Sequence, residues 1–129
     1  MAGDAGKERN FNLEERTAVF GESVIVFAKS LPRDVVTSSL ISQLVRSATS
    51  IGANYCEACD AQSNKDFIHK IAICRKESHE TKHWLRMVAA AAPERKQDAR
   101  KLWHEAQQLT LIFATIGRKA AGKEPPKRR

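Results

Sequence analysis

The sequence predicts an all-α protein, specifically an antiparallel up-down-up-down four-helix bundle. Apolar residues recur at alternating intervals of three and four in four stretches, short breaks separate those stretches, and no segment follows the two-residue period of a strand. The chain has 129 residues, of which 42% are hydrophobic and 29% charged, which fits one folded domain and excludes a disordered or collagen-like chain. We expect the bundle to span residues 11–121, between a flexible N-terminal segment at 1–10 and a flexible basic tail at 122–129.

The first predicted helix begins at Asn12 and ends at Leu31. Glu14 and Glu15 would face the positive end of the helix dipole, which favours a start at this point. Pro32 then forces the preceding residue out of the helical region. The residues expected to face the core are Leu13, Thr17, Phe20, Val24, Phe27 and Leu31.

The second predicted helix covers about residues 37–61 and is capped by Thr37 or Ser38. Small residues dominate its middle, and Gly52 costs roughly 1 kcal/mol in a helix interior relative to Ala. Close approach of another helix is the simplest compensation for that cost. The expected core-facing residues are Leu40, Leu44, Ser47, Ile51, Tyr55 and Ala58.

The third predicted helix is capped by Ser63 or Asn64 and ends near Ala92, and Pro93 then fits the first turn of the fourth helix. Gly122 closes the fourth helix. The expected core-facing residues are Phe67, Ile71, Cys74, Ser78, Thr81, Leu85 and Val88 in the third helix, and Ala99, Leu102, Ala106, Leu109, Phe113, Ile116 and Ala120 in the fourth.

The net charge of +7 is concentrated near the C-terminus. From Arg118 onward, six basic residues stand against Glu124 alone, so the rest of the chain is only mildly basic. Such a tail is more often a solubilising end than a dedicated contact, although assembly would bring several tails together. Three cysteines are too few for a disulfide scaffold, and no apolar run is long enough to cross a bilayer. We therefore expect a cytoplasmic protein without a membrane partner.

One catalytic motif is present. Residues 79–83 read His-Glu-Thr-Lys-His, which is the zincin pattern on a predicted helix, with Glu80 as the base and His79 and His83 as zinc ligands. The usual third histidine is missing, because Ala89 stands at its position, and no predicted strand could hold a peptide substrate. We therefore predict neither metal, cofactor nor catalytic residue, and keep a zinc-dependent hydrolase as the alternative.

A polar layer between the second and third helices is a simpler role for Glu80. With a turn at residues 62–63, antiparallel pairing places Arg46 level with Glu80, Glu57 level with His69, and Asn54 near Ala72. Charges between helices are tolerated when paired, and we expect this layer to fix the register of the two helices. A metal or redox site at Cys56 and Cys59, which lie near His69, is the less favoured use of this region. The predicted layer consists of Arg46, Asn54, Glu57 and Glu80.

Cations on the last two helices are the candidates for contact with RNA or DNA. Acidic residues interleave with them on the third helix, so a solvated face of mixed charge is the alternative. Trp84 and Trp103 could stack on bases, or pack between helices or subunits together with Ile112. The candidate nucleic-acid-binding residues are Lys70, Lys76, Lys82, Arg86, Arg118 and Lys119.

The run QLVRSATSIGANY at residues 43–55, followed by matching residues at 65–70 and 76–82, resembles the bacterial four-helix-bundle proteins named after the 23S rRNA intervening sequence. The resemblance implies a small non-enzymatic protein that assembles as a homopentamer. It also implies a relation to the accessory variability determinants of diversity-generating retroelements, which bind nucleic acid and a reverse transcriptase.

Taken together, these observations predict a homo-oligomeric binding or scaffold protein that contacts nucleic acid or a nucleic-acid enzyme. A protein-protein adaptor that binds no nucleic acid is the alternative from a different functional class.

Overall fold

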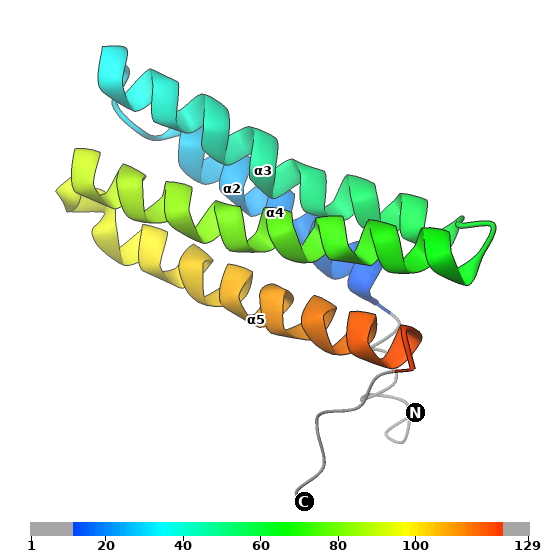
Figure 1. Cartoon of the computed structure of the whole chain (residues 1–129). Helices are drawn as coiled ribbons and strands as arrows, with labels where there is room; N and C mark the ends of the chain where they lie inside the picture. The colour runs from blue at the N-terminus through cyan, green and yellow to red at the C-terminus, as the bar shows by residue number, and fades with distance from the viewer. Residues whose placement is uncertain (1–11, 123–129) are drawn as a thin grey trace, which may run out of the picture.

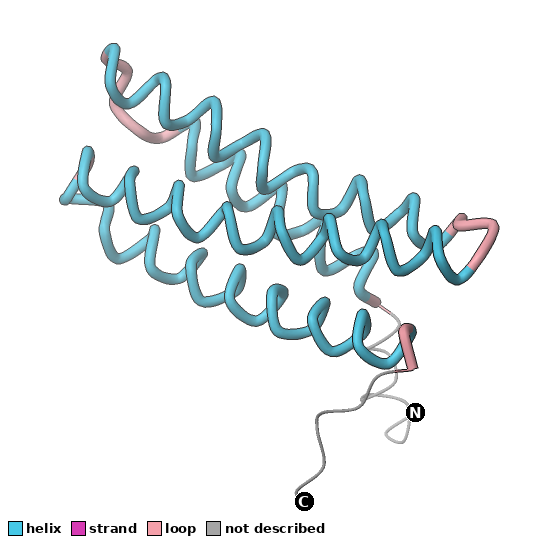
Figure 2. The backbone as a smooth tube through the Cα atoms, in the orientation of Figure 1, coloured by secondary structure: helices cyan, strands magenta, loops and turns pink. Residues whose placement is uncertain are grey.

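The computed structural model describes residues 12–122, and it confirms the predicted all-α four-helix architecture. The helices are α2 (Leu13–Lys29), α3 (Val35–Cys59), α4 (Asn64–Ala91) and α5 (Lys96–Ala120), and they run antiparallel to their neighbours along the chain (Figure 1). A 3₁₀ turn, η2 (Pro93–Arg95), joins α4 to α5, and no strand occurs between residues 12 and 122 (Figure 2). The predicted flexible segment 1–10, and residues 123–129 of the predicted tail, lie outside the described residues.

Several helix boundaries differ from prediction. The first helix ends at Lys29 and the second at Cys59, each about two residues before the predicted end, and the starts of α3 and α5 differ as well. The Asp34 carboxylate accepts a hydrogen bond from the Thr37 backbone N–H at 2.8 Å, so Asp34 is the cap in place of the predicted Thr37 or Ser38. α3 therefore begins at Val35, two residues before the predicted start at about residue 37. Pro93 opens the 3₁₀ turn η2 and not α5 itself. Ser63 caps α4 as one of the two predicted alternatives, its hydroxyl accepting from the Asp66 N–H at 3.1 Å.

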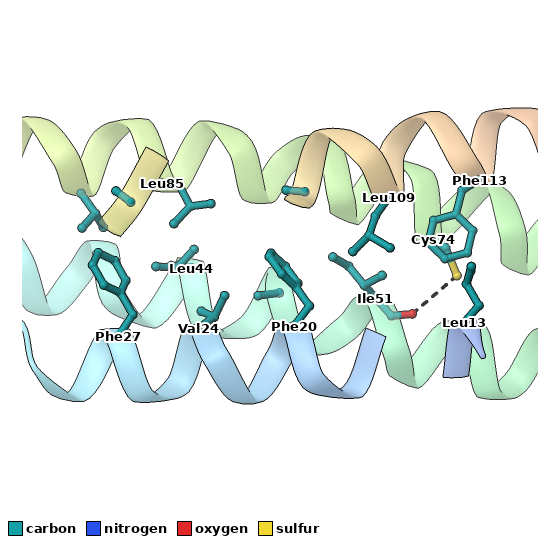
Figure 3. Close-up of a cluster of buried hydrophobic side chains, with 14 of the residues drawn as sticks. Leu13, Phe20, Val24, Phe27, Leu44, Ile51, Cys74, Leu85, Leu109 and Phe113 are labelled. Atoms are coloured by element: carbon teal, nitrogen blue, oxygen red, sulfur yellow. Dashed lines mark hydrogen bonds between the residues drawn. The ribbon is translucent and has the colours of Figure 1, made fainter. Parts of the chain in front are cut away.

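The core runs along the whole bundle and is built from the predicted seams (Figure 3). Phe20 and Val24 of α2 belong to one cluster with large aliphatic and aromatic residues of the other three helices, and Phe113 lies at the end of that cluster near Leu13 and Cys74. The small-residue stretch of α3 lies against α2, where a Cβ on Gly52 would come 3.2 Å from the Thr17 hydroxyl oxygen. Close packing, as predicted, is therefore what compensates for glycine in this helix.

The four helices do not pack equally. α4 packs along most of its length against both α3 and α5, whereas α2 packs mainly on α3 and touches α5 only thinly. A groove therefore remains between α2 and α5, lined in part by Leu13, Leu111, Ile112 and Ile116. None of the helices between residues 12 and 122 is long and apolar enough to cross a membrane.

Candidate nucleic-acid interface and polar layer

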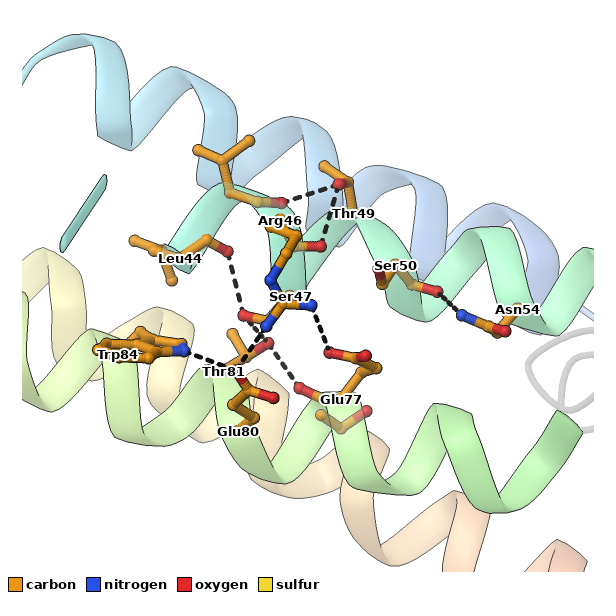
Figure 4. Close-up of polar contacts among 12 residues, drawn as sticks. Leu44, Arg46, Ser47, Thr49, Ser50, Asn54, Glu77, Glu80, Thr81 and Trp84 are labelled. Carbon is orange, nitrogen blue, oxygen red and sulfur yellow. Dashed lines mark hydrogen bonds and ion pairs between the residues drawn. The ribbon is translucent and has the colours of Figure 1, made fainter. Parts of the chain in front are cut away.

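Arg46 is the centre of the polar contacts between α3 and α4 (Figure 4). Its Nη2 lies 2.5 Å from Glu80 Oε2, and its Nη1 lies 3.4 Å from Glu77 Oε1. The Trp84 indole N–H donates to the same Glu80 oxygen at 2.9 Å. The indole hydrogen bond, followed by the charge of Arg46, lowers the pKa of Glu80 although partial burial opposes the shift. Glu80 is thus held as a carboxylate by two donors.

A second, buried contact lies next to this ion pair. The hydroxyl oxygens of Ser47 on α3 and Thr81 on α4 are 2.9 Å apart, and both side chains are fully buried. Both hydroxyls also reach carbonyl oxygens one turn back in their own helices. Small side chains let the two backbones approach, and the hydrogen bonds satisfy the polar atoms enclosed there.

The other two residues of the predicted layer do not join this cluster. The Asn54 side-chain amide donates to the Ser50 carbonyl in its own helix at 2.9 Å. Glu57 pairs with Lys70 at 2.5 Å and not with the expected His69, so the ion pair is displaced by one residue from the level pairing. Contacts between charged side chains of α3 and α4 therefore occur at two separate points.

The zincin-like residues have surroundings unlike a metal site. His79 and His83 are exposed, and the ring of His83 packs edge-on against Trp84 with centroids 4.9 Å apart. Glu80 faces Arg46. Within residues 12–122, no three His, Cys, Asp or Glu side chains come together as a possible metal-binding group.

The cysteines occupy two environments. Cys56 and Cys59 are exposed on α3, and the Cys56 thiol lies 3.6 Å from the Glu14 carboxylate of α2. Desolvation, with Glu14 adding to it, raises the pKa of Cys56. Cys74 is buried beside the Ile51 carbonyl, and burial raises the pKa of its thiol to about 12. A raised pKa disfavours the nucleophilic thiolate at both positions.

The six candidate nucleic-acid-binding residues are not on one surface. Lys70 is held by Glu57 on the α3 side of α4, and Lys76 is close enough to Glu80 to help lower its pKa. Lys119 lines the groove between α2 and α5. The remaining three, Lys82, Arg86 and Arg118, lie along the junction of α4 and α5.

This α4–α5 junction is the basic surface of the bundle, and we call it the basic groove. Near η2 it forms a pocket of about 420 Å³. In its middle, the Lys82 ammonium lies 2.5 Å from the Gln107 side-chain oxygen and 5.3 Å from the centroid of the Trp103 ring. At its other end, Arg75 and Arg118 line a second pocket. The residues around the pocket near η2 are Leu85, Arg86, Ala89, Lys96, Ala99, Arg100, Trp103 and His104.

Lys96 and Arg100, the α5 cations of the pocket near η2, were missed in the sequence, although a signal for them exists. α4 and α5 run antiparallel on either side of η2, so residues at equal distances from this turn lie level with each other. This pairing places Lys82 beside Trp103 and Arg86 beside Arg100. Lys96 and Arg100 are also one helical turn apart, so they share a face of α5.

Residues 9–114 match the family model described as the 23S rRNA-intervening sequence protein. The chain belongs to this family. The match covers most of the chain and includes α2, α3 and α4 in full. It agrees with the resemblance carried by residues 43–55.

A solved structure supports the assignment of this intervening-sequence protein. A protein of unknown function from the S23 ribosomal protein family of Bacteroides thetaiotaomicron is similar to it, with a TM-score of 0.72 and 27% sequence identity. The alignment covers 81% of this chain and 96% of the other. No curated protein matches the chain.

Proposed function

We propose that this intervening-sequence protein is a non-enzymatic scaffold that binds nucleic acid through the basic groove and works as a homo-oligomer. The observation that carries the proposal is a separation of charge within α4 and α5. In residues 12–122, the cations held in ion pairs are Arg16, Arg46, Lys70 and Arg95, so those of the basic groove keep their charge for a ligand.

The three glutamates of the same two helices turn to α2 and α3. Glu77 and Glu80 of α4 face Arg46 on α3. Glu105 of α5 forms a two-pronged ion pair with Arg16 on α2, with N–O distances of 2.7 and 2.9 Å. No carboxylate lines the two pockets of the basic groove among the described residues. A phosphate backbone along this groove would meet cations without meeting a competing anion.

The opposite side of the molecule carries the other sign. A groove between α2 and α3 is lined by Glu14, Glu15 and Glu22 without any Lys or Arg among its described lining residues. This polarity would orient an approaching polyanion toward α4 and α5. Trp103 adds an aromatic surface on the basic side.

Binding of fluorescent single-stranded RNA, followed by anisotropy at two salt concentrations, tests the nucleic-acid part of the proposal. We expect R86E together with R100E to weaken binding at least tenfold. The salt dependence of binding should also become shallower, because a protein that makes fewer phosphate contacts releases fewer counterions when it binds. The control is K29E, a single charge reversal outside the basic groove. Lys29 is exposed in the last turn of α2. Equal loss in K29E, or salt-insensitive binding, would contradict the role of the groove.

The homo-oligomer is supported by apolar side chains left in solvent at two places. Val26 of α2 is 71% exposed, and Leu111 of α5, which is 51% exposed, lines the groove between α2 and α5. Val35 and Val36 at the start of α3 are 89% and 63% exposed. Two different patches suit a ring, because a ring closes through unlike surfaces of neighbouring copies. Five subunits is the number that the family resemblance implies.

Light scattering coupled to gel filtration tests the assembly. We expect a mass of five chains for the native protein and a smaller mass for V26E and for V35E, since a charge in either patch disrupts a contact with the next copy. Q97E, on an exposed position of α5 outside both patches, is the control for an added surface carboxylate. A monomeric native protein would remove this part of the proposal and leave the basic groove intact.

A nucleic-acid enzyme as a further partner follows from the suggested relation to the accessory variability determinants. Co-purification with such an enzyme that is lost on nuclease treatment would indicate bridging by nucleic acid. A partner retained after nuclease treatment, with no RNA or DNA bound by the protein alone, would favour the adaptor alternative.

A further inference from the structure

The pocket near η2 has two kinds of wall. Leu85 and Ala89 of α4 face Ala99 and Trp103 of α5, which gives an apolar slot with an aromatic side. Basic side chains line the rest of it, namely Arg86 from α4 and Lys96, Arg100 and His104 from α5. A flat apolar group that carries an anion matches both kinds of wall at once.

The size of the pocket suits a small group. Its volume of about 420 Å³ is near the lower end of the roughly 300–1,000 Å³ typical of small-ligand pockets. One nucleotide is a group of that scale, whereas a base-paired duplex can only lie across the opening. Alanines at positions 89 and 99 leave the slot open, because larger side chains there would fill it.

Trp103 differs from the other tryptophan in a way that suits a ligand. The Trp84 indole N–H donates to Glu80, whereas that of Trp103 makes no hydrogen bond within residues 12–122. Trp103 is half-buried and sits in the pocket wall, with the Lys82 ammonium over its ring. A base would contact the part of the Trp103 ring that lines the pocket and that Lys82 does not cover.

The cations are arranged for a phosphate. Lys96 and Arg100 lie one turn apart in the first two turns of α5, where the helix dipole adds positive potential. Arg86 lines the pocket from the opposite helix. A phosphate placed here would be approached by charged donors from two sides.

We propose that the pocket near η2 takes one unstacked nucleotide of a single-stranded RNA or DNA, with the base against Trp103 and a phosphate among Arg86, Lys96 and Arg100. This inference rests on the proposed function and assigns it a substrate class. The strand would run along the basic groove and insert a single base at this end. Duplex lacks a free base and would make only the phosphate contacts.

Single-stranded and duplex RNA of equal length distinguish this proposal from general charge attraction. We expect the native protein to prefer the single strand, and W103L to lose about tenfold in affinity for it while keeping the same salt dependence, because stacking of one base is worth roughly 1–3 kcal/mol. Duplex binding should not change. W103F keeps an aromatic face and should recover most of the loss, and W84L, at the tryptophan outside the pocket, is the matched control with an expected change below twofold.

Tryptophan fluorescence of W84F, in which Trp103 is the remaining tryptophan, reads the pocket directly. We expect saturable quenching by adenosine 5′-monophosphate, reduced at least tenfold in affinity by K96A with R100A, and none by inorganic phosphate at the same ionic strength. An octa-adenylate strand should bind more tightly than the free nucleotide. Tighter binding of the free nucleotide would overturn the assignment to a strand.

The failure of this inference and that of the proposed function are separable. The nucleotide pocket is wrong if W103L binds single-stranded RNA like the native protein and adenosine 5′-monophosphate causes no quenching. The proposed role of the basic groove would still stand if salt-dependent RNA binding is lost in R86E with R100E. If no RNA binds at all, both fall. Circular dichroism of each variant shows whether the bundle is folded.

Discussion

Glu80 is the residue at which the sequence motif and the structure indicate different chemistry. In the pattern His-Glu-x-x-His it would be a general base, yet its carboxylate is bound by Arg46 and by the Trp84 indole. A carboxylate held by two donors is stabilised in its charged form, which lowers its proton affinity and makes it a poorer base. Its surroundings are those of an interhelical contact.

We predict that E80Q lowers the free energy of unfolding by about 1 kcal/mol at pH 7, because a partly exposed ion pair and a charge-assisted hydrogen bond are weakened. The pKa of Glu80 is lowered in the folded state, so its contribution is present above its ordinary value of 4.5 and is lost as the pH falls below it. Urea unfolding at pH 7 and pH 3.5 measures this. The difference between E80Q and the native protein should shrink at pH 3.5.

The matched control is E94Q, which changes an exposed carboxylate on η2. E94Q should stay within about 0.5 kcal/mol of the native protein at either pH, as exposed surface changes usually do. A difference between E80Q and the native protein that persists undiminished at pH 3.5 would show that the carboxylate charge is not what stabilises the contact.

Cysteine reactivity gives a second prediction at the residue scale. At pH 8 a disulfide reagent should modify two thiols of the native protein without denaturant, those of Cys56 and Cys59, because both are exposed, with the raised pKa of the Cys56 thiol slowing its reaction. Cys74 is buried and the pKa of its thiol is raised to about 12, so it should react only in denaturant. C74A should keep both reactive thiols, and three reactive thiols in the native protein would contradict the buried position.

Helix pairing is the level at which the sequence was most informative. The seams of all four helices were readable because each buried stripe repeats for several turns, and Arg46 could be placed near Glu80 because the α3–α4 turn is short. The cap at Asp34 was missed because threonine is also a common capping residue. The residue types do not decide between Asp34 and Thr37, and the backbone conformation of the structure does, because Asp34 is extended and accepts from the Thr37 N–H. One-residue displacements such as Glu57 with Lys70 depend on side-chain length, which periodicity does not encode.

The close contact of α2 with α3 yields a prediction at the element scale. G52V places a branched side chain where a Cβ would already lie 3.2 Å from the Thr17 hydroxyl, so α2 must move away. We expect a loss of about 2 kcal/mol in the free energy of unfolding, measured by urea titration. A53V, at the next and exposed position on the rim of the groove between α2 and α3, acts mainly on helix propensity and should cost under about 1 kcal/mol.

Val is a better helix former than Gly, so helix propensity alone would make G52V neutral or stabilising, and a G52V that loses no stability would contradict the close contact with α2. The variant G52V with T17A tests the same point from the other helix. Removing the hydroxyl and methyl of Thr17 should restore part of the stability, because the two side chains compete for one space.

At the scale of the whole molecule, α2 is the least supported helix. It is the shortest of the four, and apart from α3 it is held by a thin contact with α5 to which the Arg16–Glu105 ion pair contributes. Regions with fewer packing partners open at lower free energy than the core. We predict that amide hydrogens of α2 exchange faster than those of the central helix α4, and that R16A speeds exchange in α2 without changing α4. Equal protection of the two helices would show that α2 and α4 open together.

The basic groove and the C-terminal tail divide the positive charge of the chain between them, and truncation separates their roles. Residues 123–129 hold four Lys and Arg against one Glu, so a chain ending at Gly122 loses a net charge of three and keeps the pocket near η2. We predict weaker binding of single-stranded RNA and a shallower salt dependence, with the preference for single strand over duplex unchanged, because phosphate contacts carry affinity while the pocket selects an unstacked base. Anisotropy with both RNAs at two salt concentrations measures each quantity.

Loss of the preference for single strand on truncation would place the selection of an unstacked base in the tail. An unchanged salt dependence would show that the tail makes no phosphate contacts and that the basic groove binds RNA by itself.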